Sequence, residues 1–232
     1  MGIFDALSTL TSGLSSQSAA LQNISNNIAN SQTPAFSQTN TQFMDTMNAL
    51  QSSATVAPIS NPTNDVHGAI QTSTVDTYMA ISGDGYFTVE APTGFNNGQP
   101  VFDGTKLYTR RGDFQPDGNG NLVNGAGYYL VGAPPIDPAT GTVDVAAIPL
   151  VHIEGEQYLQ PVGGEAFATT PLSGPAVTGA TGTVVGNALE ASNTDVTSQI
   201  TAMVQTQQAY DLDSQALTTN DQMIQTLTNM VV

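Results

Sequence analysis

The two ends of the chain carry apolar residues at helical spacing. Near the N-terminus, apolar side chains recur at alternating intervals of four and three residues, with one polar interruption at Gln17. This heptad spacing is typical of a coiled-coil seam about 28 residues long. The C-terminal segment follows the same template from about Asn193 to the end, and Asn193, Thr194 or Asp195 is the expected N-cap. The seam positions expected to pack between subunits are Ile3, Leu7, Leu10, Leu14, Leu21, Ile24, Ile28, Val196, Ile200, Met203, Tyr210, Leu217 and Ile224.

The middle of the chain has the pattern of strands and turns. It holds 20 of the 22 Gly and 12 of the 13 Pro, all between residues 58 and 186. Apolar, β-branched runs at 78–81 and 86–89 flank Ser82-Gly83-Asp84-Gly85, which indicates a hairpin. A second hairpin is expected from 106–110 and 121–131, around the turn at 117–120, and 143–153 is a further strand candidate.

These patterns predict an α+β fold. Long N- and C-terminal helices, residues 1–30 and 193–232, would pair as a coiled-coil layer. A central antiparallel β-rich domain is expected over residues 64–151. Residues 31–63 are expected to form an extended connector into that domain, and 152–192 a returning connector.

The remaining faces of the two helices are polar but almost uncharged. Residues 1–33 contain 17 Ser, Thr, Asn or Gln with Asp5 as the single charge, and residues 192–232 contain 21 such side chains with no Lys or Arg. Uncharged polar groups are desolvated at far lower cost than charges, so these helices are expected to be surrounded by other protein. The alternative is a disordered low-complexity terminus in the isolated monomer, and the two interpretations are compatible if the ends fold on assembly.

Charge and composition exclude several classes of function. The chain has 3 Lys+Arg against 19 Asp+Glu, a net charge of -16, so neither a nucleic acid nor an anionic membrane surface is an expected partner. The three basic residues, Lys106, Arg110 and Arg111, all lie in the middle segment and are expected to form ion pairs. There is no Cys, no apolar run long enough to span a membrane and no pattern of a cleaved signal peptide.

The sequence offers little for catalysis, metal binding or a cofactor. His67 and His152 are isolated from other ligand-type residues. The segment from Asp117 imitates the first ligands of a calcium loop, but it lacks the turn Gly and the bidentate Glu, so a plain turn is expected. Arg111-Gly112-Asp113 spells an adhesion tripeptide, a weak match. We therefore expect a protein that is not an enzyme and that has no catalytic residues, no metal and no cofactor.

Short motifs follow one another along nearly the whole chain. They are Ser12-Gly13-Leu14, Ile24-Ser25-Asn26-Asn27-Ile28-Ala29-Asn30, Thr33 with Phe36, Ala80-Ile81 with Gly83, Gly85-Tyr86-Phe87 and Val89, Tyr108-Thr109-Arg110 with Gly112 and Phe114, Gly186 with Leu189-Glu190, Ser192-Asn193 and Asp195, and finally Met203, Gln207, Ala209 and Tyr210. Together these segments resemble the flagellar axial protein family of the hook and basal-body rod. Ala35 stands where that family usually has Gly, and Ser37 where it usually has a basic residue.

The resemblance implies a structural subunit of the bacterial flagellar hook and basal body. Such proteins leave the cytoplasm through the flagellar export apparatus without a cleaved signal peptide and self-assemble helically into the axial tube. Their partners are copies of themselves and the axial proteins above and below. The size of 232 residues favours a rod-type subunit, whereas the opening residues Met1 to Leu7 are more similar to some hook proteins.

Two hypotheses from other classes stay open at this point. A secreted coiled-coil adhesin would need a conventional export signal and a ligand for its middle domain. An enzyme would need a clustered acid and base in that domain.

Overall fold

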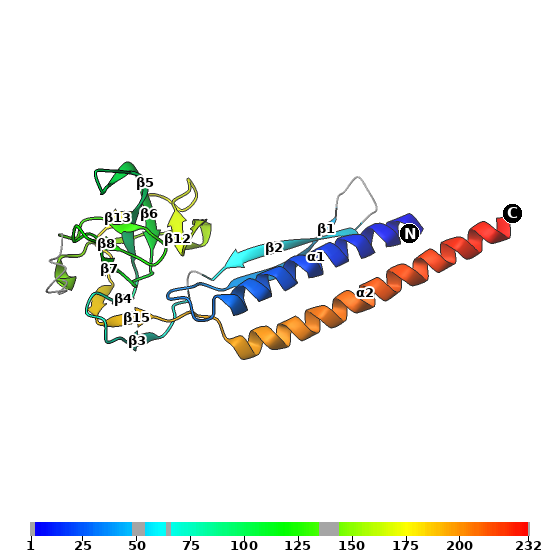
Figure 1. Ribbon diagram of the computed structural model, residues 1–232. Helices are drawn as coiled ribbons and strands as arrows, with labels where there is room; N and C mark the ends of the chain where they lie inside the picture. Colours follow the sequence, from blue (N-terminus) through cyan, green and yellow to red (C-terminus); the bar gives the residue numbers. More distant parts are fainter. Residues whose placement is uncertain (1–2, 48–53, 64–65, 135–143, 232) are drawn as a thin grey trace. The chain divides into compact units, whose positions relative to one another are not determined.

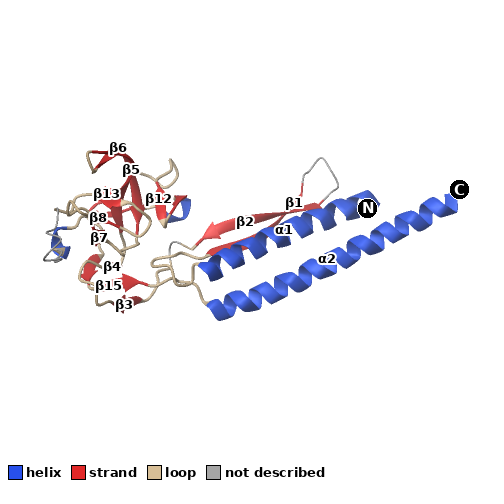
Figure 2. Cartoon of the chain, in the orientation of Figure 1, coloured by secondary structure: helices blue, strands red, loops and turns tan. Residues whose placement is uncertain are grey.

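The structure confirms an α+β protein, with two long terminal helices in contact and an antiparallel β-sheet domain between them in the sequence (Figures 1 and 2). It is a computed structural model that describes residues 3–47, 54–63, 66–134 and 144–231. The chain forms two compact units. The helical unit comprises residues 1–31, 39–62 and 194–232, and the β unit comprises 32–38 and 63–193. The chain therefore passes between the two units four times.

The helical unit is built on α1 (Ile3–Ala29) and α2 (Val196–Val231), which run antiparallel. Asn27, near the end of α1, is hydrogen-bonded to Gln199, near the start of α2, whereas Gly13 lies next to Asp213. With 36 residues against 27, α2 is longer than α1 by about 13 Å at 1.5 Å per residue. The end of α2 therefore extends past the start of α1 (Figure 1).

The segment expected to be an extended connector instead forms a hairpin in the helical unit. Strands β1 (Thr39–Met47) and β2 (Ala54–Pro62) pair antiparallel, in register from Thr39–Pro62 to Met47–Ala54. The hairpin packs along α1, where the Asn23 amide donates hydrogen bonds to the hydroxyls of Thr41 and Ser60. Backbone groups of the segment are thus satisfied within a ladder, which an extended connector would leave to solvent.

The β unit holds one large sheet and two short two-stranded sheets. The large sheet has the order β11-β12-β6-β5-β9-β8-β7, with β10 joining β5 to β13; β14 pairs with β4, and β15 with β3. The strands are β3 (Ile70–Thr72), β4 (Met79–Ser82), β5 (Tyr86–Asn96), β6 (Gln99–Thr109), β7 (Gln115–Pro116), β8 (Leu122–Val123), β9 (Tyr129–Leu130), β10 (Leu150–His152), β11 (Gln160–Gly163), β12 (Ala166–Ala168), β13 (Val177–Thr178), β14 (Thr183–Gly186) and β15 (Ala188–Glu190), with short 3₁₀ helices η1 (Val145–Ala147) and η2 (Glu156–Tyr158).

The core of the β unit lies on both faces of the large sheet, because neighbouring residues of one strand point to opposite faces. Phe87 and Val89 of β5 belong to one cluster, which Phe114 completes with an edge-on ring contact at 5.5 Å from Phe87. Tyr86 belongs to a second cluster, together with Tyr108. Strands β11 to β15 also belong to this unit, so it extends well beyond the residues 64–151 expected from the sequence.

The expected hairpins are only partly correct. Strand β4 pairs with β14 rather than with β5, so the glycine turn at 83–85 joins two different sheets. The turn at 117–120 is present, but it connects the short strands β7 and β8. The long hairpin of the unit is β5–β6, closed by Asn97 and Gly98 with φ of 50° and 78°. This hairpin is not among the expected ones, although Asn97-Gly98 is an Asn-Gly turn, the strongest short-range hairpin signal.

Candidate functional site

The predicted seam of α1 lies along the side of the helix that packs within its unit. Ile24 is buried, and the other described seam residues are half-buried. The side chain of Ile3 lies outside the described part of the structure. The half-buried seam residues of α1 are Leu7, Leu10, Leu14, Leu21 and Ile28.

The predicted seam of α2 is divided between two environments. Met203, Leu217 and Ile224 are half-buried, whereas Val196, Ile200 and Tyr210 are exposed. A seven-residue repeat drifts by about 20° per heptad around a straight α-helix. With the exception of the half-buried Met203, the apolar stripe therefore begins on an open side of α2 and turns towards the α1 side at Leu217 and Ile224. Val204 continues the open part, and we call Val196, Ile200, Val204 and Tyr210 the exposed row.

The most buried helix positions are small or polar, and the heptad pattern did not indicate them. Ser16, Ala20 and Asn27 of α1 are buried, as are Gln199 and Asn220 of α2. The sequence does carry a signal for the α1 positions, because Ser16, Ala20 and Asn27 lie at helical spacing from the seam residue Ile24. Small side chains permit close approach of neighbouring elements, and buried amides have to be hydrogen-bonded.

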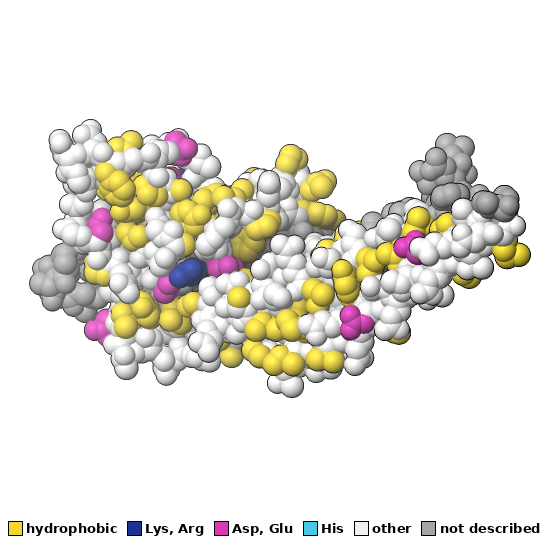
Figure 3. All heavy atoms as spheres, turned by 45° about the vertical axis from the view of Figure 1, so that its right-hand side comes forward, with side chains coloured by type: hydrophobic (Ala, Val, Ile, Leu, Met, Phe, Trp, Pro, Cys, Tyr) yellow, Lys and Arg dark blue, Asp and Glu magenta, His cyan; other side chains and the backbone are white. Residues whose placement is uncertain are grey.

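Many hydroxyl groups of the two helices are hydrogen-bonded within their own helix. Each donates to a backbone carbonyl three or four residues earlier, a geometry that Ser and Thr adopt in helix interiors. Figure 3 shows the resulting surface, on which hydrophobic side chains lie among uncharged polar ones and charged side chains are sparse. The residues that donate in this way are Thr11, Ser12 and Ser16 in α1, and Thr201, Thr206, Thr218, Thr219, Thr226 and Thr228 in α2.

The described residues offer no metal centre, since no group of three His, Cys, Asp or Glu side chains is clustered among them. The Asp117 carboxylate accepts hydrogen bonds from the backbone N–H groups of Asn119 and Asn121 and from the side-chain amide of Asn121, which makes it part of a turn. The two charged side chains of the adhesion-like tripeptide bind each other, because Arg111 and Asp113 form an ion pair. Among all the residues that the structure describes, no helix is both long enough and apolar enough to span a bilayer.

The best-defined polar cluster in the β unit is centred on Arg110. Its guanidinium Nε donates to Glu190 Oε2 at 3.0 Å, and both side chains are about 5% exposed or less. The two terminal nitrogens donate to the carbonyls of Gly85, Gly83 and Ile81, which fastens the β4–β5 turn. The other Glu190 oxygen accepts from the Gly68 N–H, so β15, the residue that follows β6 and two loops meet at one ion pair.

A second ion pair lies near Glu165. Arg111 binds Asp113 through two hydrogen bonds of 2.7 and 2.8 Å. Burial raises the pKa of the Glu165 carboxyl to about 7, although Arg111 and a hydrogen bond from the Ser37 N–H both act to lower it. Two of the three expected ion pairs are therefore present. Lys106 stands opposite Glu90 in the β5–β6 ladder, without an ion pair among the described residues.

Two residues of the C-terminal motif, Asn193 and Asp195, have definite structural roles. Asp195 is the N-cap of α2, since its side chain accepts from the Thr197 N–H. The Asn193 side chain accepts from the Gln38 N–H and donates to the carbonyls of Thr63 and Val66. These two residues therefore fix the segment where the chain passes from the β unit into α2.

Ala35 has a left-handed backbone conformation, with φ of 55°. It is buried, and its N–H donates to the Glu190 carbonyl at 2.9 Å. Glycine adopts this conformation without strain, whereas a Cβ makes it unfavourable. The position therefore requires the geometry for which Gly is suited, and this chain builds it with Ala.

Comparison with known proteins agrees with these features. Residues 80–150 match the family described as the flagellar hook protein FlgE/F/G D1 domain, and residues 185–230 match the flagellar basal body rod FlgEFG protein C-terminal family. The first match covers the central strands and the second covers β15 and nearly all of α2.

Relatives align over almost the whole chain. The flagellar basal-body rod protein FlgG of Buchnera aphidicola from Schizaphis graminum is 28% identical, over 94% of this chain and 96% of that protein. FlgG of Agrobacterium fabrum gives the same values. The flagellar hook protein FlgE of Brucella melitensis is 34% identical, but over 66% of this chain and only 37% of its own length. The chain therefore belongs to the flagellar hook and basal-body rod family, a family of structural proteins rather than enzymes.

Proposed function

We propose that this chain is a rod-type subunit of the flagellar axial structure, and that it self-assembles helically into the tube that transmits torque. One observation carries the rod assignment. The chain corresponds to rod proteins from end to end, whereas the hook proteins that it resembles are much longer than the aligned part. A hook-type subunit is the alternative.

The helical unit supports a role in the inner layer of such a tube. Its outer faces combine exposed apolar side chains with uncharged polar ones, which neighbouring helices can cover without burying charge. The predicted seam residues have two tasks in this proposal. Those that are half-buried hold α1, α2 and the hairpin together, and the exposed row contacts the helices of neighbouring subunits.

The proposal includes three further elements that follow from family membership. The subunit leaves the cytoplasm through the flagellar export apparatus without loss of a signal peptide. It contacts other axial proteins above and below its own segment. Its place in the cell is the basal body.

Immunogold electron microscopy of basal bodies from the native bacterium tests the rod assignment. Antibodies against the β unit should label the rod and not the hook. Label along the hook would favour the hook-type alternative, and absence of label from both structures would exclude an axial role.

A pair of variants tests the task given to the exposed row. Ile200 is 52% exposed in the single chain. The variant Ile200→Asp places a charge there, and a neighbouring subunit would have to bury that charge on assembly. Polymerisation at high protein concentration should therefore be lost. Gln205→Asp places the same charge on the opposite side of the same helix and should reduce polymerisation less. Equal losses would contradict the special role of the row, and circular dichroism would check that both variants remain folded.

A further inference from the structure

Part of the β5–β6 hairpin projects beyond the large sheet. Strand β9 pairs with β5 only at Val89 and Glu90, and β12 pairs with β6 only at Tyr108 and Thr109. Residues 92–102 therefore form a two-stranded arm that runs from the Pro92–Phe102 pair to the Asn96–Gln99 pair, with a register shift between Pro92 and Gly94. The only strand partners of these residues within the described part of the chain are each other. We call this segment the hairpin arm.

The hairpin arm ends in an apolar, uncharged tip. Phe95 is 66% exposed and Val101 is 43% exposed, whereas Phe102 packs edge-on against Tyr129 at 5.3 Å between ring centroids. No charged residue lies between Glu90 and Asp103. An exposed aromatic ring on a projecting turn is an unusual use of hydrophobic surface in a monomer, and it indicates a contact with another molecule.

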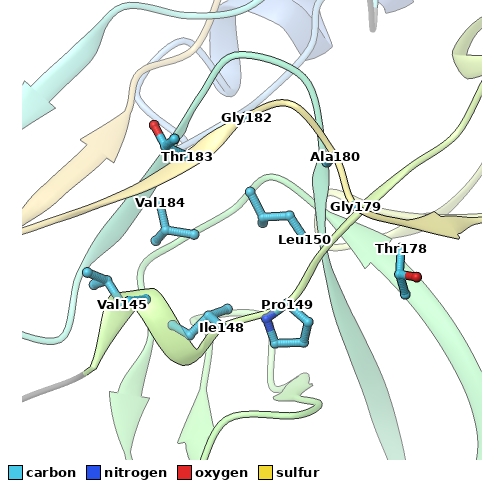
Figure 4. Close-up of a pocket in the computed structure, with 11 residues that line it drawn as sticks. Val145, Ile148, Pro149, Leu150, Thr178, Gly179, Ala180, Gly182, Thr183 and Val184 are labelled. Carbon is cyan, nitrogen blue, oxygen red and sulfur yellow. The ribbon is translucent and has the colours of Figure 1, made fainter.

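A pocket of about 510 Å³ opens elsewhere on the β unit (Figure 4). Its walls are η1 with the following residues Ile148, Pro149 and Leu150, and the loop from Thr178 to Val184. Figure 4 shows the side chains of Val145, Ile148, Pro149, Leu150 and Val184 around the hollow, with glycines in the facing loop. No charged residue lines it, and its volume lies within the range of pockets that accept a compact ligand.

We propose that the hairpin arm of one copy of this chain inserts Phe95 into this pocket on the next copy in the polymer. The inference rests on the proposed axial function and adds a specific contact to it. A chain with a net charge of -16 repels its own copies, so contacts between copies are least costly where both surfaces are uncharged. The hairpin arm and the pocket both meet that condition, and the aromatic ring at the tip would bury its apolar surface against the apolar side chains of the pocket walls.

The hairpin arm cannot fill the pocket of its own chain. Leu150, in the pocket wall, pairs with Phe87 of β5, and Phe95 lies eight residues further along the same strand. At 3.3 Å per residue, the tip is roughly 25 Å away along a paired, extended ladder. The occupant must therefore come from another copy. Because the two surfaces differ, the contact is head-to-tail, and repeated contacts of this kind build an open helical polymer.

Disulfide trapping tests the contact cleanly, since the natural chain has no Cys. The double variant Phe95→Cys, Thr178→Cys places one thiol at the tip of the hairpin arm and one at the exposed rim of the pocket. The polymer is oxidised and then dissociated without reductant for electrophoresis. We expect a ladder of trimers and larger species, because each copy can be linked to two others. The matched control pairs Phe95→Cys with Leu172→Cys, another exposed apolar position of the β unit, and should give no ladder.

Two further results complete the test. Polymer that forms without a ladder in the Thr178 variant, or with an equal ladder in the control, would overturn the contact while leaving the axial function intact. Absence of any polymer in the natural chain would instead count against the axial function. Independently, Phe95→Ser should raise the protein concentration needed for polymerisation by about tenfold, and Phe95→Leu by much less, with no change in thermal unfolding of either monomer. An unchanged threshold in Phe95→Ser would also overturn the contact.

Discussion

The side-chain amide of Asn27 on α1 donates a hydrogen bond of 3.0 Å to Oε1 of Gln199 on α2, although the two residues are 172 positions apart in the sequence. The same Asn27 amide also binds the backbone of Thr39 twice, donating to its carbonyl and accepting from its N–H, both at 2.9 Å. One buried side chain thus joins both helices and the first strand of the hairpin. Its contacts set the register of the whole helical unit.

Replacing Asn27 by Ala should destabilise the helical unit by about 2 kcal/mol, because it removes three hydrogen bonds of a buried side chain, two of them to backbone groups of Thr39. Hydrogen exchange of the α1 and hairpin amides measures the effect, which should appear as loss of protection there while the β unit stays protected. Asn26→Ala, at the exposed neighbouring position, is the control and should change little. Equal protection in the two variants would show that the buried amide does not join these elements.

Replacing Arg110 by Lys should destabilise the β unit by about 3 kcal/mol. A lysine keeps the charge but cannot donate hydrogen bonds to Glu190 and to three backbone carbonyls at once, since its ammonium group lacks the planar, five-donor geometry of a guanidinium. Urea unfolding followed by tyrosine fluorescence measures the loss. The control is Arg111→Lys, at a more exposed pair with Asp113, for which we expect about 1 kcal/mol. A smaller loss at Arg110 than at Arg111 would contradict this account of the buried pair.

Ala35→Gly should stabilise the protein by about 0.5 to 1 kcal/mol. The substitution relieves the left-handed strain at Ala35, and the greater freedom of Gly in the unfolded chain offsets only part of that gain. Ala35→Val should have the opposite effect, because a β-branched residue tolerates positive φ even less well. Thermal unfolding of the three proteins should therefore give the order Gly, Ala, Val; any other order would indicate that backbone strain is not decisive here.

Glu165 should make the β unit more stable in mild acid than at neutral pH. Its pKa is about 7 in the folded chain, against 4.5 in its reference state, because burial disfavours the carboxylate. Between these values the folded state binds more protons than the unfolded state, so its stability falls as pH rises. Glu165→Gln should reduce that slope in urea unfolding between pH 5 and 8, and Glu154→Gln, at an exposed position, should not. Identical slopes in all three proteins would reject the assignment to Glu165.

The sequence was sufficient for the fold class because each zone had a uniform local signal. Heptad spacing identified both helices, and glycine and proline confined the strands to the middle. The sequence was insufficient to predict strand pairing. The turn at Gly83 and Gly85 has the residue types of a hairpin turn, but it joins strands that belong to different sheets. Partners such as β4 and β14 are about a hundred residues apart, and pairing at that distance depends on side chains that meet only in the folded unit.

Prediction of the candidate site was limited for a similar reason. The heptad positions indicated an apolar stripe, but they did not indicate which part of it is covered within a single chain. The buried positions Ser16, Ala20 and Asn27 are spaced at helical intervals, but small or polar side chains are not the residues that a heptad pattern of large apolar side chains selects. By contrast, Glu190, Asn193 and Asp195 were recognisable through the family motif, and the structure supplies the hydrogen bonds that explain each of them.

The hydroxyl groups that bond within their own helices have a mechanical consequence. Because residues such as Thr201 and Thr219 direct their protons to their own backbone, a helix packed against them meets few donors that need a particular partner. Such a surface adheres by dispersion and shape, and its energy changes gradually as one helix slides along another. A shaft assembled from these faces can absorb small axial displacements between subunits under load without breaking specific bonds.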